Sequence, residues 1–372
     1  MIQSTLMNRV FILIILSLFT FNLAAQDSVM TMTFEEYNPT STLVVPGEKI
    51  VSAKYPFIDV HSHLWRMATM DLEKTTREMD SLNLKVLVNL SGRSGDQLSA
   101  MSDAVQSIAP NRFIIFANVN FSGMDEPNWT TNAVAQLRED YKNGARGLKI
   151  FKNLGLTATD NNGERIKTDD PRIAPIWDLC GELGIPVLIH TGEPAVFWDP
   201  IDEKNERWLE MKQFPNRHRG DTTRFPSWEI VMQEQWNIFA NHPNTIFINA
   251  HLGWMANDLD RLGRHLEEFP NVYTEIAAVI AELGRQPRYA REFFIKYQDR
   301  LLFGKDTYRP HEFHTYFRVL ESDDEYFDYF RKRHAFWKMY GMNLPDEVLK
   351  KVYYKNALKI IPGIDKSLFP AD

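Results

Sequence analysis

Eight short apolar runs, separated by segments of helical character, constrain the fold of this 372-residue chain more than any other feature. Most of them are nearly continuous in apolar residues, which is typical of strands buried on both faces, as in parallel sheets. Turns such as 144–147 and 184–186 contain glycine and join a helical segment to the next run. The predicted strands cover residues 57–63, 84–91, 113–121, 145–151, 185–191, 245–252, 272–278 and 301–306.

The helical segments between these runs complete a repeating strand–helix pattern. Eight such units in about 310 residues predict an α/β protein with the (β/α)8 architecture of a TIM barrel. An open, doubly wound sheet is the alternative, but it would not bring the ends of strands one, five, six and eight together, as a closed barrel does. The predicted helices cover residues 72–81, 97–108, 131–143, 175–183, 228–240, 257–269 and 287–297.

Three additions extend the minimal barrel, and together they define a domain over residues 55–372 with an arm before it. A long insertion, 193–227, follows the fifth strand and should overhang the catalytic face, where such loops set substrate choice. Residues 307–372 should supply the eighth helix and extra C-terminal helices, with a final amphipathic helix over 346–361. Residues 26–54 are predicted to form an extended N-terminal arm that lies across the barrel.

Residues 1–25 have the composition of a secretory signal peptide. Arg9 supplies the positive region, an apolar stretch covers 10–23, and two alanines at 24–25 form a cleavage site before Gln26. The apolar stretch has about fourteen residues, whereas a membrane span needs about twenty. An uncleaved anchor is the alternative. We therefore expect a periplasmic or secreted protein without stable membrane association after cleavage.

Composition limits the partners. The chain carries 42 Lys and Arg against 49 Asp and Glu, a net charge of −7, which disfavours nucleic acid or an anionic membrane as the main partner. Its hydrophobic content of 44% and charged content of 24% are typical of a folded domain. The one cysteine, Cys180, leaves no intrachain disulfide to form. A small-molecule substrate is expected, and a homo-oligomer is compatible with this composition.

Ligand-type residues stand at the ends of four predicted strands. His61 and His63 lie two apart on the first strand, so their imidazoles face the same side. Later strands end in His190, His251 and Asp306. Because the C-terminal ends of barrel strands meet at one face, these side chains predict a site for a divalent metal, zinc or manganese.

These residues could divide the chemistry of a catalytic metal among themselves. His61, His63, His190 and Asp306 could close three or four positions around one ion, leaving an open position for a water whose pKa falls to about 7. Asp306 is expected both to bind the metal and to accept the proton of that water. His251 could bind the metal directly or lie beside it, bonding the water and polarising the substrate's carbonyl.

Two further residues lie near these strand ends. Asp59 shares the strand parity of His61 and His63, and we expect it to orient a ligand imidazole. Lys149, in the fourth strand, has three interpretations. It could be carboxylated and bridge two metals, hold a substrate carboxylate or carbonyl, or pair structurally with an acid such as Glu275. The second role, with one metal, is our prediction.

Several cationic or imidazole side chains on the same face are candidates for substrate contact. Arg93 follows the second strand and Arg309 follows the eighth, and both are predicted to bind a substrate carboxylate. The remaining candidates are Arg217, Arg219, His218, His311 and His314.

The order of these motifs resembles the amidohydrolase superfamily, and more narrowly its amidohydrolase-related branch of metal-dependent hydrolases and decarboxylases. The resemblance extends from about residue 55 to 360, and it is specific as a set although no single motif is. The matching stretches are FIDVHSH at 57–63, GLK at 147–149, PVLIHTG at 186–192, NAHLG at 249–253, LFGKD at 302–306 and NAL at 356–358.

The resemblance implies a (β/α)8 barrel in which His61, His63, His190 and Asp306 bind one divalent metal and His251 lies beside it. Two features depart from the pattern. Lys305 stands where the branch commonly has a small residue, and the long insertion prevents the substrate from being carried over.

Three functions follow from this site. The first is hydrolysis of a lactone, ester or amide bond of a small molecule by metal-activated water. The second is non-oxidative decarboxylation of an aromatic or enol acid, which the same ligands would serve. The third, a non-catalytic binding protein on the same scaffold, is disfavoured because no position of the ligand set is lost.

Overall fold

The computed structural model describes residues 31–47, 49–331 and 337–371. The predicted signal peptide, 1–25, lies outside the described residues. The chain divides into two units, Met1–Val44 and Val45–Asp372. The described part of the first unit contains a turn in which the Glu36 carboxylate accepts hydrogen bonds from the backbone N–H and hydroxyl of Thr33.

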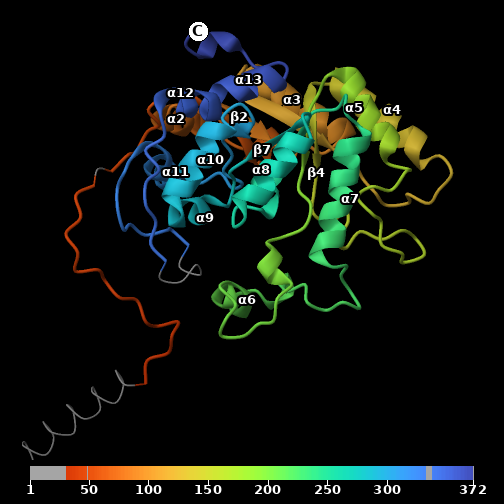
Figure 1. Cartoon of the computed structure of the whole chain (residues 1–372). Helices are drawn as coiled ribbons and strands as arrows, with labels where there is room; N and C mark the ends of the chain where they lie inside the picture. Colours follow the sequence, from red (N-terminus) through yellow and green to blue (C-terminus); the bar gives the residue numbers. More distant parts are fainter. Residues whose placement is uncertain (1–30, 48, 332–336, 372) are drawn as a thin grey trace, which may run out of the picture. The chain divides into compact units, whose positions relative to one another are not determined.

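Eight parallel strands form the centre of the second unit, which confirms the predicted TIM barrel (Figure 1). Each strand pairs with the next in chain order. Two backbone bonds link the ends of the sheet, from Val60 N–H to Phe303 O and from Asp306 N–H to His61 O. The strands are β1 (Phe57–Ser62), β2 (Leu84–Asn89), β3 (Phe113–Asn118), β4 (Ala145–Ile150), β5 (Val187–Ile189), β6 (Phe247–Asn249), β7 (Val272–Glu275) and β8 (Leu301–Leu302).

Helices follow the strands around the barrel, and several begin at a capping residue. The side chains of Asp71, Ser227 and Asp258 each accept a hydrogen bond from a backbone N–H of the first turn of the helix that follows. The barrel helices are α2 (Leu72–Leu82), α3 (Gly95–Ile108), α4 (Trp129–Lys142), α5 (Ala174–Leu183), α7 (Trp228–Asn241), α8 (Leu259–Glu268), α9 (Ile280–Arg285), α10 (Pro287–Lys296) and α11 (Pro310–Glu321).

The fifth, sixth and eighth strands are shorter than predicted, so three of the expected site residues lie just beyond them. His190 follows β5, and His251 lies in the short helix η4 (Ala250–Trp254) after β6. The backbone of His251 and Asp306 is left-handed, with φ of 58° and 80°. The chain therefore leaves the extended conformation at these positions, and strand alternation alone does not set the direction of their side chains.

The predicted additions have secondary structure of their own. The insertion contains η2 (Ala195–Phe197), α6 (Trp208–Gln213) and η3 (Pro215–Arg217). The expected final helix over 346–361 is a helical run of α12 (Asp346–Lys350), the π-helical η6 (Lys351–Lys355) and α13 (Asn356–Ile360), and η7 (Lys366–Leu368) follows it. Between α11 and α12, Phe327 and Met339 form an isolated antiparallel bridge.

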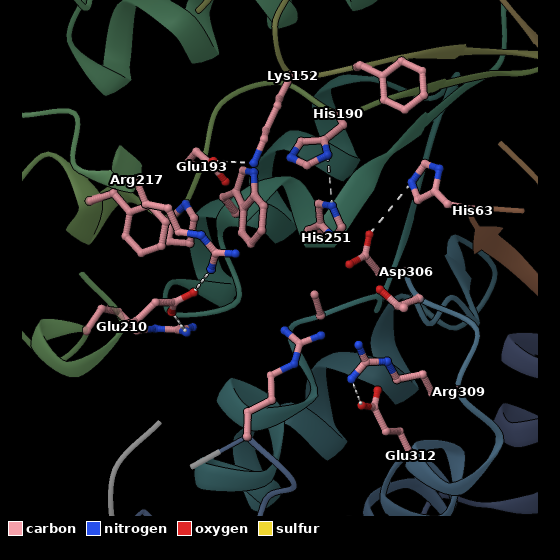
Figure 2. A pocket seen from close by; sticks show the side chains of 18 of the residues that line it. His63, Lys152, His190, Glu193, Glu210, Arg217, His251, Asp306, Arg309 and Glu312 are labelled. Atoms are coloured by element: carbon pink, nitrogen blue, oxygen red, sulfur yellow. Dashed lines mark hydrogen bonds and ion pairs between the residues drawn. The ribbon is translucent and has the colours of Figure 1, made fainter. Parts of the chain in front are cut away.

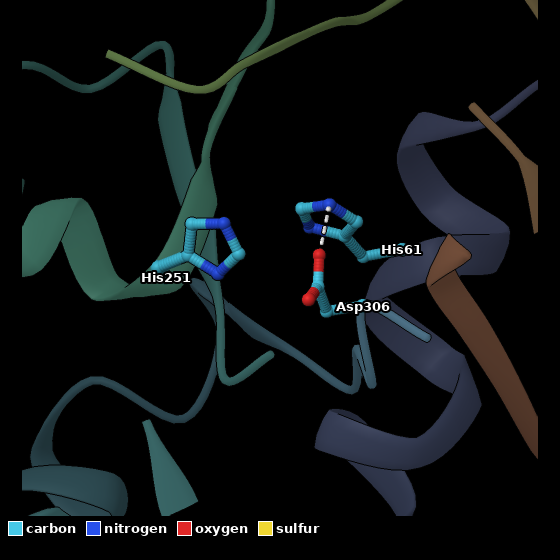
Figure 3. Close-up of side chains that lie close together, drawn as sticks. All are labelled: His61, His251 and Asp306. Atoms are coloured by element: carbon cyan, nitrogen blue, oxygen red, sulfur yellow. Dashed lines mark ion pairs between the residues drawn. The ribbon is translucent and has the colours of Figure 1, made fainter. Parts of the chain in front are cut away.

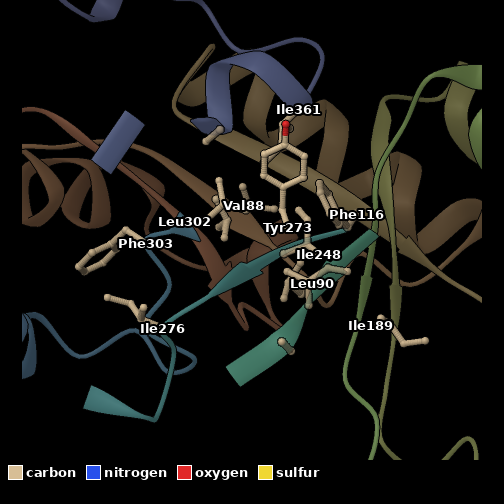
Figure 4. Close-up of a cluster of buried hydrophobic side chains, with 14 of the residues drawn as sticks. Val88, Leu90, Phe116, Ile189, Ile248, Tyr273, Ile276, Leu302, Phe303 and Ile361 are labelled. Atoms are coloured by element: carbon tan, nitrogen blue, oxygen red, sulfur yellow. The ribbon is translucent and has the colours of Figure 1, made fainter. Parts of the chain in front are cut away.

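A continuous apolar core fills the barrel and the space beneath its helices. Figure 4 shows part of it, in which Val88 of β2, Phe116 of β3, Ile248 of β6 and Leu302 of β8 are gathered. All four side chains are fully buried, so the strands form a rigid support for the residues at their ends. Among the described residues, no helix has the length and apolar character needed to cross a membrane.

Candidate metal centre

Three potential ligands converge at the C-terminal end of the barrel. One ligand atom each from His61, His251 and Asp306 lies within 4.8 Å of the others (Figure 3). His251 and Asp306 also line a cavity of about 510 Å³, to which His63 and His190 contribute (Figure 2). Three of the five residues predicted from the strand ends therefore converge on one point, and His63 and His190 border the same cavity.

The His61 imidazole has one nitrogen occupied and the other directed at the centre. Its Nδ1 lies 2.8 Å from Oε1 of Glu275 on β7 and donates to it. Its Nε2 lies 3.5 Å from Oδ1 of Asp306, and it is buried without a hydrogen-bond partner in the described part of the chain. A cation placed here would accept the buried lone pair of Nε2 and be neutralised by the carboxylate beside it.

His251 is held in the same way from the opposite part of the barrel. Its backbone N–H donates to Oε1 of Glu275 at 2.8 Å, and its Nδ1 donates to the carbonyl of Ala277 at 2.8 Å. Because a carbonyl only accepts, the proton of neutral His251 is on Nδ1 and its Nε2 carries a lone pair. Nδ1 of His190 lies 3.2 Å from that Nε2, and the Nε2 of His190 has no partner among the described residues.

His63 borders the cavity on another side. Its Nδ1 lies 2.8 Å from the Ser91 hydroxyl, and its Nε2 lies 4.0 Å from Oδ1 of Asp306. Its ring stacks against Trp65 and Phe151, with ring centres 5.6 Å away in both cases. Thus His61, His63 and His251 each have Nδ1 bonded to the surrounding protein. Nε2 of His61 and His63 is left for a ligand, whereas Nε2 of His251 is bonded to His190.

The protonation states suit a cation. Burial lowers the pKa of His63 to about 4 and lowers the pKa values of His61, His190 and His251 as well, so all four are neutral near pH 7. Burial alone would raise the pKa of Asp306, but the electrostatic effect of the surrounding His61, His251, His63 and Arg331 side chains more than offsets it, and the pKa lies well below the usual range. Neutral imidazoles around an ionised carboxylate are the donor set of a zinc or manganese site, so these residues fit a divalent ion.

Glu275 supports two of the potential ligands from behind. Besides His61 and His251, it accepts a hydrogen bond from the N–H of Ala277 at 2.5 Å. Gly304 makes room for this arrangement, because a Cβ at that position would overlap the Glu275 carboxylate and touch His61. The sequence assigned Glu275 only as a partner for Lys149. The available signal was an acidic residue inside the seventh apolar run, 272–278.

Asp59 does not have the role expected from the sequence. Its Oδ1 accepts from the backbone N–H groups of His61 and Lys305, both at 3.0 Å, and the imidazole of His61 is bonded to Glu275 instead. Burial raises the pKa of Asp59 to about 8. Asp59 therefore fixes the backbone of β1 beside the segment that carries Asp306.

Lys305, the departure from the family pattern, is not among the residues that line the cavity. Its buried ammonium contacts Glu312 of α11 at 2.5 Å and the carbonyl of Thr307 at 3.3 Å. The side chain thus joins the end of β8 to the first turn of α11. The large residue is accommodated because it has its own buried acidic partner.

Lys149 lies beneath the centre and is not among the residues that line the cavity. Its side chain is buried, its Nζ has no hydrogen-bond partner in the described structure, and the ring of Phe151 is 5.6 Å from it. Burial lowers its pKa to about 7. The structural pairing with Glu275, one of the three interpretations, is not observed as a hydrogen bond, although the charge of Glu275 acts on Lys149.

The arginines predicted to bind substrate lie in different places. Arg309 lines the cavity and lies 3.4 Å from Glu312, and Arg217 of the insertion lines it while paired with Glu210. Arg93 is exposed and outside the lining residues, and its guanidinium lies 4.6 Å from the ring centre of Trp65. Arg219, His218, His311 and His314 are outside the lining residues too.

Comparison with known proteins gives one family match and several similar folds. A family model described as Amidohydrolase matches residues 58–362. An uncharacterized TIM-barrel protein from Bordetella bronchiseptica has 16% identity and a TM-score of 0.51, with 82% of this chain and 97% of that chain covered. No curated protein matches the chain.

Two solved enzymes have the same architecture. A dihydroxybenzoic acid decarboxylase from a Polaromonas species, with bound manganese and 2-nitroresorcinol, has 14% identity and a TM-score of 0.51, covering 82% of this chain and 96% of that chain. A 4-oxalomesaconate hydratase from Rhodopseudomonas palustris has 14% identity and a TM-score of 0.50, covering 84% and 97%. At these identities the likeness establishes the fold.

Proposed function

The chain belongs to the amidohydrolase family, and from this we propose that it is a metal-dependent hydrolase that cleaves a lactone, ester or amide bond of a small molecule. The observation that carries the proposal is the cluster of His61, His251 and Asp306 within 4.8 Å at one end of the cavity. Their neutral imidazoles and ionised carboxylate supply both lone pairs for a cation and a base.

We infer that one divalent ion is held by His61, His63, His190 and Asp306, with His251 beside them. When bound, such an ion lowers the pKa of water and withdraws electrons from a carbonyl group. The Nδ1 bonds of His61 and His63 to Glu275 and Ser91 keep the Nε2 atoms available. His190 could bind the ion in one of two ways. Its Nδ1 would give up the hydrogen bond to His251 and bind the ion, or its Nε2, which has no partner among the described residues, would bind it.

Asp306 is the proposed general base. Its carboxylate stays ionised and faces the cavity, so it can take the proton from an attacking water and return it to the leaving group. His251 is neutral and presents an acceptor, so it would orient that water or bind the metal. In this protonation state it cannot donate to a developing oxyanion, the role expected from the sequence.

The reaction class can be tested by product analysis. The metal-loaded protein would be incubated with lactones, esters, N-acyl compounds and hydroxybenzoates, and bond opening would be followed alongside release of carbon dioxide. Hydrolysis that disappears in Asp306→Asn supports the proposal. Carbon dioxide release without hydrolysis would contradict it.

Decarboxylation of an aromatic or enol acid is the second candidate. It is favoured by a small excess of positive charge in the cavity lining, which carries five cations, Lys152, Arg207, Arg217, Arg309 and Arg331, against four acids, Glu193, Glu210, Asp306 and Glu312. A cationic lining suits an acidic substrate. In this reaction Asp306 would deliver a proton to carbon instead of taking one from water, and the decarboxylase of similar fold gives a precedent for the architecture.

A further inference from the structure

We propose that Arg331 binds a carboxylate of the substrate, and hence that the substrate is an organic acid whose charged group lies apart from the bond that reacts. The inference rests on the proposed function, because it concerns the same cavity, and it names the substrate class that the cavity accepts. Arg331 lies in the segment between α11 and α12 and was not among the sequence candidates.

The other cations of the cavity already have acidic partners. Lys152 lies 2.5 Å from Glu193, and Arg309 lies 3.4 Å from Glu312. The remaining two arginines both contact Glu210, Arg207 at 2.9 Å and Arg217 as well, and Arg207 also bonds Glu282. These four side chains are thus neutralised by the protein itself.

Arg331 differs because the described structure gives it no hydrogen bond and no ion pair. Its one contact of note is with the ring of Phe330, whose centre is 5.5 Å from the guanidinium carbon. Asp306 and Glu312 line the same cavity, but neither forms an ion pair with it. Burial alone would lower the pKa of Arg331, but nearby charges, those of Asp306 and Glu312 among them, raise it, although neither carboxylate accepts a hydrogen bond from its guanidinium N–H groups. An incoming anion would supply those acceptors to a partly buried guanidinium.

The geometry of a guanidinium favours a planar carboxylate. Its N–H groups form a fork that can make two parallel hydrogen bonds to the oxygens of one carboxylate. The lining also includes aromatic rings, from Trp65, Phe151 and Trp254, that can contact an apolar or aromatic body between the anion and the metal centre. Asp306 lines this cavity as well, so the proposed anion site and the metal centre open into one space.

Equilibrium binding of benzoate and of benzyl alcohol, its uncharged counterpart, tests this inference on the full-length, metal-loaded protein. Calorimetry would compare the wild type with Arg331→Gln and Arg331→Lys. The matched control is Arg288→Gln, which changes an exposed arginine on α10 outside the cavity lining. Metal content and the thermal unfolding midpoint would be measured for each variant, so that misfolding is recognised.

We expect Arg331→Gln to weaken benzoate binding by roughly ten- to hundred-fold, the usual effect of losing a charge-assisted hydrogen bond. Arg331→Lys should retain part of the affinity, and benzyl alcohol binding should stay unchanged in every variant. Unchanged benzoate affinity in a folded Arg331→Gln would overturn the inference. Inorganic phosphate that binds the wild type more tightly than benzoate would overturn the choice of a carboxylate.

The same data separate this inference from the proposed reaction. If benzoate binding depends on Arg331 but no bond is hydrolysed in the substrate panel, the hydrolase proposal fails while the anion site stands. If hydrolysis occurs and the benzoate affinity does not change in Arg331→Gln, the anion site fails while the hydrolase proposal stands.

Discussion

The chemistry of the centre depends on which nitrogen of each imidazole carries the proton. The Ala277 carbonyl can only accept, which places the proton of neutral His251 on Nδ1, and an ionised Glu275 accepts from Nδ1 of His61 in the same way, so both Nε2 atoms carry lone pairs. Each imidazole is thus oriented before any ligand arrives. This arrangement lowers the conformational cost of assembling a metal site.

Replacement of Asp306 tests the proposed proton transfer. Asp306→Asn keeps the shape of the side chain but removes the basic oxygen, so kcat should fall by roughly a hundred- to ten-thousand-fold, the usual contribution of a general base. Steady-state kinetics on a substrate from the panel would measure it, with metal content determined in parallel. A variant that keeps its metal and its turnover would show that another group moves the proton.

Metal retention should depend on pH in a way set by burial. A ligand imidazole must be neutral, and burial lowers the pKa of His63 to about 4. Protons therefore compete only near and below that pH, so the ion should be kept from about pH 7 to about pH 5 and released on further acidification. Dialysis at stepped pH followed by metal analysis would measure this. Loss of most of the ion between about pH 7 and pH 6, in a protein still folded by circular dichroism, would contradict it.

The side chains at the strand ends could be predicted from the sequence, but the residues that form hydrogen bonds to them and set their tautomers could not. His61, His63, His190 and Asp306 could be placed because they stand where apolar runs end. Their tautomers depend on cross-barrel hydrogen bonds that no local pattern encodes. Arg331 lies far along the chain in an irregular segment, and only the folded structure reveals that it lines the cavity without a hydrogen bond or ion pair among the described residues.

At the scale of elements, the insertion is fastened to the barrel by buried charges. Arg207, at the start of α6, bonds Glu282 of α9 as well as Glu210 of its own helix. All three side chains are buried. Since this network forms one wall of the cavity through Arg207 and Glu210, it ties the shape of the pocket to the docking of the insertion.

Glu282→Gln tests the contribution of this attachment. The change removes one of the negative charges that neutralise the buried guanidinium of Arg207. The free energy of unfolding should therefore fall by about 2 kcal/mol or more. The control is Glu206→Gln, which removes a more exposed partner of Arg285 and should cost at most about 1 kcal/mol. Denaturant unfolding of both variants would measure the difference. Equal effects would mean that the buried pair does not fasten the insertion.

The order and type of the elements could be predicted because the apolar runs and helical segments alternate without interruption. The ends of the strands could not be. The run over 245–252 was expected to be extended, whereas β6 ends at Asn249 and the chain turns into left-handed conformations from His251. Hydrogen bonds from His251 to Glu275 and Ala277 stabilise that turn, and both partners belong to the next strand and its loop.

At the scale of the whole molecule, we propose that the enzyme is exported. The positive residue, the apolar stretch and the two alanines at 24–25 predict a mature chain that begins near Gln26. N-terminal sequencing of the protein isolated from its own host would measure this. An intact Met1 on protein from the cytoplasm would contradict the proposal.

Metal analysis tests the central claim most directly. We predict about one tightly bound divalent ion per chain in the wild type and none in the double variant His61→Ala, His63→Ala, because those imidazoles face the centre. His242→Ala, which removes a histidine paired with Asp178 and outside the cavity lining, should keep the ion. Full occupancy in the folded double variant would contradict the account, and so would a wild-type ratio near two that falls in Lys149→Met.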